Sequence, residues 1–154
     1  QMIDMRINEG ISLHLPLIGD NIIPIDIYGG PDQRRVIEVT ESNQKKLEKR
    51  CKEGKAWVVG LLPGIKSEYT KGFQGDLEKI IMKKENLEFK DFKIEGASEL
   101  TSLGMYRPLS QKINNLKWKI DKKNCPVFDF WLHKGTYATS LLREIMKSGN
   151  MKVY

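Results

Sequence analysis

The residues best suited to chemistry lie near the carboxy terminus, in the turn Lys134-Gly135-Thr136-Tyr137 and at Thr139 just beyond it. A helix that begins here presents unpaired backbone N–H groups and the positive end of its dipole, which favours phosphate or another anion. The threonine hydroxyls add hydrogen-bond donors, and Lys134 adds positive charge. An accessible tyrosine can also stack on a nucleobase, which contributes about 1–3 kcal/mol. The residue types therefore predict a turn that binds an anion and a base.

A purely structural interpretation of the same turn is also open. Thr136 can serve only as a helix N-cap, Tyr137 as a packed aromatic side chain and Lys134 as a solvated surface charge. On residue types alone, this second interpretation is favoured.

A change of hydrophobic period predicts the elements that position the turn. Residues 128–133 alternate in character from one position to the next, which is typical of a half-buried strand. After Gly135 the apolar residues recur at helical spacing, at Ala138, Leu141, Leu142, Ile145 and Met146. The stretch from Phe128 to Gly149 is therefore predicted to be a strand, a glycine turn and an amphipathic helix.

Apolar patterns elsewhere predict further strands, with turns marked by glycine, proline, aspartate and asparagine. Strands are expected at 11–18, 22–28, 36–39, 56–62 and 116–120, and a turn at 121–124 leads into 125–132. The continuous apolar run at 56–62 favours a buried central strand. Pro16 and Pro24 indicate edge strands or bulges, because proline cannot donate to a β ladder.

Helices are expected at 41–54, with Thr40 as the N-cap, and from Asp76 through Glu85. Leu47 and Cys51 form the sparse apolar side of the first of these helices. Residues 87–106 predict short irregular elements. Together these elements define the fold class as α+β, with a largely antiparallel or mixed sheet and flanking helices.

The composition limits the classes of protein to which this chain can belong. The 154 residues include 26 Lys and Arg against 20 Asp and Glu, a net charge of +6. This balance favours polyanions such as nucleic acid as partners, although the same lysines can simply solvate the surface. No apolar run is long enough to span a bilayer, and residues 1–10 lack the apolar region of a signal peptide. We therefore expect a cytoplasmic protein without membrane association.

Neither a metal site nor a self-contained active site is expected. Cys51 and Cys125 have no metal-type spacing and are interpreted as reduced thiols. His14 and His133 are the only histidines, which argues against zinc. No nucleophile motif such as G-x-S-x-G or H-E-x-x-H occurs.

The segment FDFWLHKGTYATSLLREIMK resembles the carboxy-terminal signature of the TruD family of tRNA pseudouridine synthases. That signature is an aromatic-rich strand, then Leu-Pro-x-Gly-[Ser/Thr]-[Tyr/Phe]-Ala-Thr, then a helix with Arg-Glu. The matching residues are Leu132, Gly135, Thr136, Tyr137, Ala138, Thr139, Leu142, Arg143 and Glu144. The departure is His133, where the family usually has proline.

Weaker matches follow upstream in the family's order. Gly19-Asp20 resembles a short Gly-Asp turn, Leu62-Pro63-Gly64 a Leu-Pro-Gly segment, and Ser102 to Arg107 a Ser-x-Gly-x-x-Arg segment. The resemblance thus covers most of the chain from about Ile11 onward, and it is most specific in the last third.

The resemblance implies conversion of uridine to pseudouridine in tRNA, without a cofactor. In the family an aspartate attacks, the glycosidic bond breaks and the uracil re-attaches through carbon, after the nucleotide has left its stack. The family's aromatic residue at the turn contacts the target base and corresponds to Tyr137. Lys134, Gly135, Thr136, Thr139 and Arg143 complete the expected substrate-binding set, with Arg143 fixing the local architecture through hydrogen bonds.

The family's catalytic aspartate lies in a Gly-x-Lys-Asp motif, which this sequence lacks. The resemblance therefore implies a carboxy-terminal portion without the nucleophile, an expectation to which the initial Gln1 also points. Residues 1–107 would belong to the TRUD insertion domain, and residues 108–154 would return into the catalytic domain. We expect tRNA and the missing amino-terminal half of the enzyme as partners, with the oligomeric state open.

Two other classes of protein remain as alternatives. One is a non-catalytic RNA-binding module with a degenerate pseudouridine synthase fold, which would use Lys117 and Lys119 in salt-dependent binding. The other is a protein-interaction domain whose positive charge is incidental.

Overall fold

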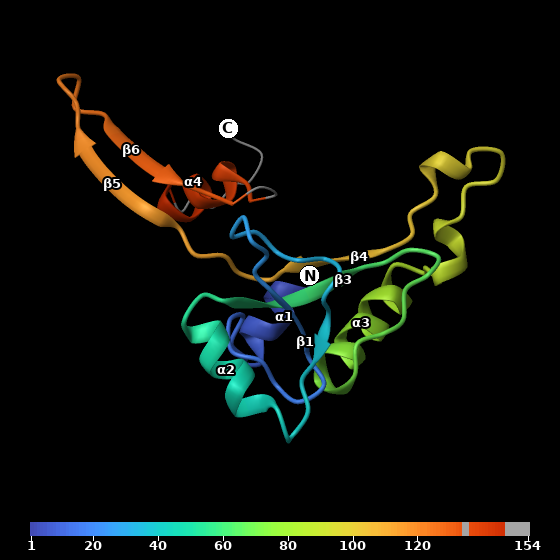
Figure 1. Cartoon of the computed structure of the whole chain (residues 1–154). Helices are drawn as coiled ribbons and strands as arrows, with labels where there is room; N and C mark the ends of the chain where they lie inside the picture. Colours follow the sequence, from blue (N-terminus) through green and yellow to red (C-terminus); the bar gives the residue numbers. More distant parts are fainter. Residues whose placement is uncertain (134–135, 147–154) are drawn as a thin grey trace. The chain divides into compact units, whose positions relative to one another are not determined.

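The structure of the chain is a computed structural model that describes residues 1–133 and 136–146 (Figure 1). The chain forms two compact units: unit 1 spans Gln1–Ser110, and unit 2 begins at Gln111. Both contain antiparallel strands together with helices, which confirms the predicted α+β class. The assignment of residues 1–107 and 108–154 to an insertion domain and a catalytic domain stays a prediction.

A four-stranded antiparallel sheet, in the order β2-β1-β3-β4, forms the centre of unit 1. Its strands are β1 (Asn21–Pro24), β2 (Ile37–Glu38), β3 (Ala56–Leu62) and β4 (Met105–Pro108). Ile22 lies opposite Val58 in the β1–β3 register, and both are buried. The apolar run at 56–62 is thus the buried central strand that the sequence predicts.

Unit 1 contains three α-helices: α1 (Met2–Asn8), α2 (Gln44–Lys52) and α3 (Gly72–Lys84). Two short 3-10 helices, Phe89–Phe92 and Ser98–Leu100, precede β4 within the stretch predicted to be irregular. Leu47 and Cys51 of α2 pack into the core with Ile22 and Val58. Burial raises the pKa of the Cys51 thiol to about 11, so this cysteine is a neutral core residue.

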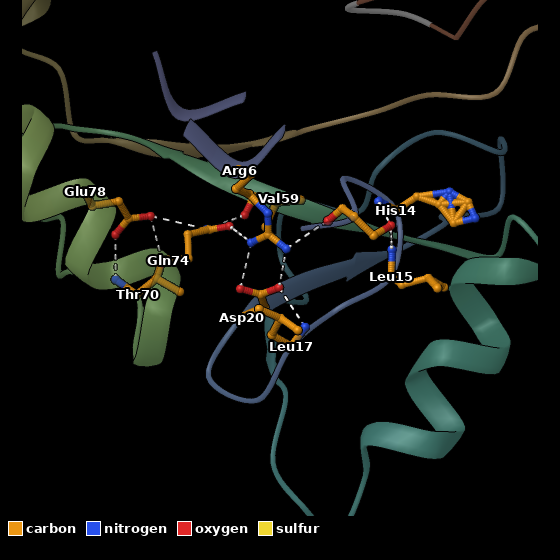
Figure 2. Close-up of polar contacts among 10 residues, drawn as sticks. Arg6, His14, Leu15, Leu17, Asp20, Val59, Thr70, Gln74 and Glu78 are labelled. Atoms are coloured by element: carbon orange, nitrogen blue, oxygen red, sulfur yellow. Dashed lines mark hydrogen bonds and ion pairs between the residues drawn. The ribbon is translucent and has the colours of Figure 1, made fainter. Parts of the chain in front are cut away.

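A buried ion pair joins the amino-terminal helix to the rest of unit 1 (Figure 2). Two guanidinium nitrogens of Arg6 donate to the two carboxylate oxygens of Asp20, each at 3.0 Å. Arg6 also donates to Gln74 Oε1 at 2.7 Å and to the carbonyl of Ser12 at 3.0 Å. Arg6 is 0% exposed and Asp20 is 1% exposed, so the pair is shielded from solvent.

Gln74 extends this network to β3 and within α3 (Figure 2). Its amide nitrogen donates to the carbonyl of Val59 at 2.8 Å and to Glu78 Oε1 at 3.3 Å. Glu78 in turn accepts from the backbone N–H of Thr70 at 2.8 Å and from the Thr70 hydroxyl at 2.9 Å. The helices α1 and α3 and the strand β3 are therefore held by one set of buried hydrogen bonds.

The predicted strand at 11–18 is wrong, because this segment is irregular. Its backbone groups bond to side chains instead of a neighbouring strand. The Ser12 hydroxyl accepts from the N–H groups of His14 and Leu15, and Asp20 accepts from the N–H of Leu17. Local side-chain bonds of this kind replace a β ladder.

Three further boundaries differ from the sequence prediction. β1 ends at Pro24 because Asp26 accepts from the N–H groups of Tyr28 and Gly30 and so turns the chain. β1 pairs with β2 on one side and with β3 on the other, so the prediction that it is an edge strand is wrong. Pro24 is the last residue of β1. The helix expected at 41–54 begins at Gln44 with Asn43, not Thr40, as its N-cap. The helix expected from Asp76 begins earlier, at Gly72.

Unit 2 consists of a hairpin and a helix. β5 (Asn114–Ile120) pairs with β6 (Pro126–Trp131), and α4 (Ala138–Met146) follows. The strand, turn, strand and helix predicted from residue 116 onward are confirmed over the described residues. The predicted end of the helix, residues 147–149, lies outside them.

The two cysteines are expected to differ strongly in reactivity. Only the thiolate is nucleophilic, and with a pKa of about 11 the Cys51 thiol is about 0.1% ionised at pH 8. Iodoacetamide at pH 8 should therefore label the exposed Cys125 quickly and the buried Cys51 very slowly, with the rate at Cys51 still rising above pH 10. Peptide mass spectrometry measures both rates, and equal rates in the folded chain would contradict this assignment.

Replacing Asp20 with asparagine tests the buried ion pair. Asp20→Asn keeps the shape of the side chain but leaves the charge of Arg6 buried without its counter-ion, which typically costs about 3–5 kcal/mol. Hydrogen exchange of the β1 and β3 amides reports the free energy of unfolding of unit 1. Asp76→Asn, which removes an exposed pair with Lys79, is the matched control and should leave this free energy close to that of the unmodified chain. If both substitutions lowered the free energy of unfolding of unit 1 equally, the central role of the Arg6–Asp20 pair would be refuted.

Candidate functional site

The predicted turn lies between β6 and α4. The N–H of Thr136 donates to the carbonyl of His133 at 3.0 Å, and the N–H of Ser140 donates to the carbonyl of Tyr137 at 3.1 Å. The backbone therefore turns directly before the helix, as expected for a site at a helix N-terminus. Two predicted members of the site, Lys134 and Gly135, lie outside the described residues.

The side chain of Thr136 fastens the turn to the beginning of unit 2. Its hydroxyl donates to Oε1 of Gln111, which precedes β5. Because α4 begins at Ala138, Tyr137 occupies the position directly before the helix. Sequence reasoning missed Gln111, since nothing in a glutamine 25 residues away signals this bond.

Tyr137, Thr139 and Arg143 are all exposed, and Tyr137 exposes 58% of its surface. Thr139 and Arg143 are four residues apart on α4 and so lie on the same side of the helix. Tyr137 and Arg143 also make further contacts within the chain. The structure thus brings the described members of the predicted site together on one turn and the helix that follows it.

A second aromatic group precedes the turn. The rings of Trp131 and His133 meet edge to face, with centroids 4.4 Å apart and planes at 75°. Trp131 remains 50% exposed, so it adds an accessible indole to the strand before the turn. His133, which replaces the proline usual in the resembling family, therefore has a packing partner of its own.

The described residues of the turn carry groups that can bind a ligand. Among the described residues, no group of three or more His, Cys, Asp or Glu side chains is placed to hold a metal ion. An exposed aromatic ring and a hydroxyl beside a helix N-terminus are suited to a base and its phosphate, and the Arg143 guanidinium lies in the last turn of the same helix. None of the described helices is long and apolar enough to cross a membrane.

Two of the three upstream motifs that resemble the same family, Leu62-Pro63-Gly64 and Ser102 to Arg107, meet in unit 1. The N–H of Ile65 donates to the carbonyl of Ser102 at 2.9 Å, and the Ser102 hydroxyl donates to the carbonyl of Pro63 at 3.3 Å. A Cβ atom on Gly64 would lie 2.0 Å from the backbone nitrogen of Gly104. Glycine at 64 therefore permits a close backbone contact. Through these contacts the two motifs link the loop after β3 to the segment before β4, and this link is named here the clasp.

A shallow cleft of about 390 Å³ lies beside this clasp, and its lining includes Lys66 and Tyr106. The hydroxyl of Tyr106 accepts from the amide of Asn21 at 3.2 Å. Burial, followed by the negative charge of Glu78, raises the pKa of Tyr106 above its usual value, so the phenol stays neutral. No residue pattern in the sequence signals this cleft.

Comparison with known proteins identifies the family. Residues 1–145 match the family described as tRNA pseudouridine synthase D (TruD). The probable tRNA pseudouridine synthase D of Thermococcus sibiricus is 36% identical over 142 residues, which are 92% of this chain and 33% of that protein. The protein of the same description from Picrophilus torridus is 36% identical over 148 residues, covering 96% of this chain and 35% of its own length.

A solved structure shows the same fold. The putative tRNA pseudouridine synthase D of Methanosarcina mazei superposes with a TM-score of 0.83 at 30% identity, over 96% of this chain and 35% of that one. The fold is therefore that of a pseudouridine synthase. The chain belongs to the TruD family, and it spans about one third of the length of these relatives.

Alanine at Gly64 should disrupt the clasp. Its Cβ would overlap the backbone of Gly104, and overpacking of this kind typically costs about 1–3 kcal/mol. Hydrogen exchange of the Ile65 and Lys66 amides, which donate to the carbonyls of Ser102 and Leu103, should accelerate. Gly30→Ala is the matched control, since its Cβ meets nothing closer than 3.7 Å. Unchanged exchange in Gly64→Ala would show that the close contact is absent.

Proposed function

We propose that this chain forms the substrate-binding side of a tRNA pseudouridine synthase and that a segment outside these residues supplies the nucleophilic aspartate. Membership of the TruD family over residues 1–145, a range that includes the exposed turn, is the observation that supports this function. The chain spans about one third of its relatives' length and lacks the Gly-x-Lys-Asp motif, which supports a division of the active site between two segments.

In the proposed reaction the glycosidic bond of a uridine breaks and the uracil re-attaches to the ribose through carbon. The target nucleotide must leave its stack, and an aromatic surface on the protein compensates for the stacking that is lost. Tyr137, with 58% of its surface exposed, would stack on the uracil. No cofactor is required for this isomerisation.

The other members of the site would hold the RNA backbone near the base. The N-terminus of α4 and the Lys134 ammonium attract phosphate, and Thr139 adds a hydroxyl in the first turn of the helix. Thr136 would keep the turn in place through its bond to Gln111. Gly135 would also keep the turn in place, and Arg143 would fix the local architecture. The net charge of +6 favours association with tRNA in the cytoplasm.

One observation supports a second candidate, a non-catalytic RNA-binding module. Lys117 and Lys119 are exposed on β5, where they can contact phosphates without any catalytic centre. A module of this kind would bind tRNA with a strong dependence on salt but would not form pseudouridine with any partner.

Activity should require both a complementary segment and the Tyr137 ring. The complementary segment used here is the part of the Methanosarcina mazei synthase that this chain does not match, expressed together with this chain. Pseudouridine formation in tRNA should appear only in the mixture, and Tyr137→Ala should lower kcat/KM by about 5- to 150-fold, the equivalent of one stacking interaction. Tyr137→Phe is the matched control, because it retains the ring.

The outcomes separate the candidate functions. Pseudouridine formation by the chain alone would refute the proposal that the nucleophile lies elsewhere. Tight tRNA binding without turnover in the mixture would favour the non-catalytic module. Equal kcat/KM for Tyr137→Ala and Tyr137→Phe would remove the base-stacking role of Tyr137.

A further inference from the structure

The shallow cleft beside the clasp is enclosed by three segments of unit 1. The loop after β1 reaches β4, because the amide nitrogen of Gln33 donates to the backbone carbonyl of Tyr106 at 2.7 Å. The loop after β3 is joined to the segment before β4, because the N–H of Lys66 donates to the carbonyl of Leu103 at 3.3 Å. All four residues line the cleft, which is named here the clasp cleft. Its walls are therefore held in place by the chain's own hydrogen bonds.

The clasp cleft presents apolar side chains to solvent. Leu103 and Met105 are 55% and 53% exposed, and Val36 is 38% exposed. Together with the half-buried Leu61 they line a space of about 390 Å³, which is within the range of roughly 300–1,000 Å³ typical of small-ligand sites. A methionine thioether packs favourably against an aromatic ring. The walls therefore suit a planar ligand such as a nucleobase.

Polar groups in the same cleft can hydrogen-bond the edge of a base. The Tyr106 oxygen accepts from the amide of Asn21, and a neutral phenol of this kind can also donate its own O–H. A side-chain amide has an oxygen acceptor besides its nitrogen donors, so Gln33 can accept from a base while it donates to Tyr106. Glu68 also lines the cleft, and its carboxylate can accept from an N–H group of a base.

Cationic side chains flank the clasp cleft. Lys66 lines it and is exposed. Arg34 and Arg35 come directly after Gln33 on the loop after β1, and the Arg34 side chain is 88% exposed. Asp32 orders this loop, because its carboxylate accepts from the backbone N–H and from Nε of Arg34, each at 3.2 Å, and its carbonyl accepts from the N–H of Arg35 at 3.0 Å. Positive charge beside a cleft of this size is suited to the RNA backbone.

We propose that the clasp cleft is a second RNA-binding site of this chain, in which one unpaired nucleotide places its base against Leu103, Met105 and Tyr106 and its phosphate near Lys66. The choice of RNA as the ligand rests on the proposed function, in which tRNA is the substrate. The cleft lies wholly in unit 1, so this contact is additional to the turn at Tyr137 in unit 2. It holds a nucleotide other than the target uridine and so extends the length of RNA that the chain recognises.

Two matched glutamate substitutions test the base contact. Leu103→Glu places a charge in the clasp cleft, whereas Leu100→Glu places the same charge on a leucine that is 66% exposed and does not line the cleft. Fluorescence anisotropy measures the affinity of the full chain for a labelled single-stranded decamer of uridine. Leu103→Glu should weaken binding by about 5- to 150-fold, the equivalent of one base contact, and Leu100→Glu should weaken it much less. Both are made with and without Tyr137→Ala, which measures binding at the turn separately.

Two matched lysine substitutions test the phosphate contact. Lys66→Gln removes a charge from the clasp cleft, and Lys46→Gln removes one from the exposed side of α2, which does not line the cleft. For a single strand, each lost phosphate contact lowers the slope of log affinity against log salt concentration by about 0.7. Lys66→Gln should produce this change, and Lys46→Gln should not. Hydrogen exchange of the Ile65 and Lys66 amides checks that the clasp stays closed in every variant.

The outcomes separate this site from the proposed function. Loss of affinity in Leu103→Glu with the clasp closed, and a lower salt slope in Lys66→Gln alone, support the site. Equal affinities of the two glutamate variants, equal salt slopes of the two lysine variants, or binding of uridine monophosphate as tight as that of the decamer would overturn it.

Pseudouridine formation with the Methanosarcina mazei complementary segment is measured in parallel. RNA binding that depends on the clasp cleft, without pseudouridine in the mixture, would refute the proposed function and retain the site. Turnover with the same kcat/KM and the same RNA affinity in both glutamate variants would remove the site and retain the function.

Discussion

Unit 1 depends on the buried pair of Arg6 and Asp20. Removing both charges from water is unfavourable, and the arrangement is stable because the guanidinium finds acceptors on Asp20, Gln74 and Ser12 at 2.7–3.0 Å. Asp20 and Ser12 lie in the loop before β1 and Gln74 lies on α3, so the pair sets how α1, this loop and α3 meet. The backbones also approach closely there: a Cβ on Gly19 would lie 2.8 Å from the carbonyl of Lys71. The Gly-Asp turn is therefore a structural element, and glycine at 19 permits its contact with the start of α3.

The two units differ in what stabilises them. Unit 1 combines an apolar core around Ile22 and Val58 with a buried polar network contributed by its own residues. Unit 2 has cross-strand pairs but no buried side chain among its described residues. The candidate binding turn thus lies on the unit that has the least packing of its own.

Patterns that depend on neighbours in sequence predicted the structure well. Three such patterns were sufficient to predict their elements, because each burial or pairing pattern repeats within a few residues. They are the apolar run of β3, the alternation in β5 and β6, and the helical spacing of α4. The strand expected at 11–18 failed because Ser12 and Asp20 accept from backbone N–H groups only two or three residues away, and because Arg6 of α1 donates to the carbonyl of Ser12, a contact that forms only in the folded chain. The helix α1 was missed for the same reason, since its buried residue is an arginine whose partner lies 14 residues away. At the candidate site, the turn and the exposure of Tyr137 agree with the residue types, whereas the bond from Thr136 to Gln111 has no local signal.

The turn before α4 is proposed to hold the target uridine. Photo-cross-linking of a tRNA that carries 4-thiouridine to the chain assembled with the complementary segment tests this most directly, with the linked peptide identified by mass spectrometry. Cross-links at the target uridine should map to the peptide containing Thr136, Tyr137 and Thr139. Cross-links confined to unit 1, with none in the turn, would contradict the account.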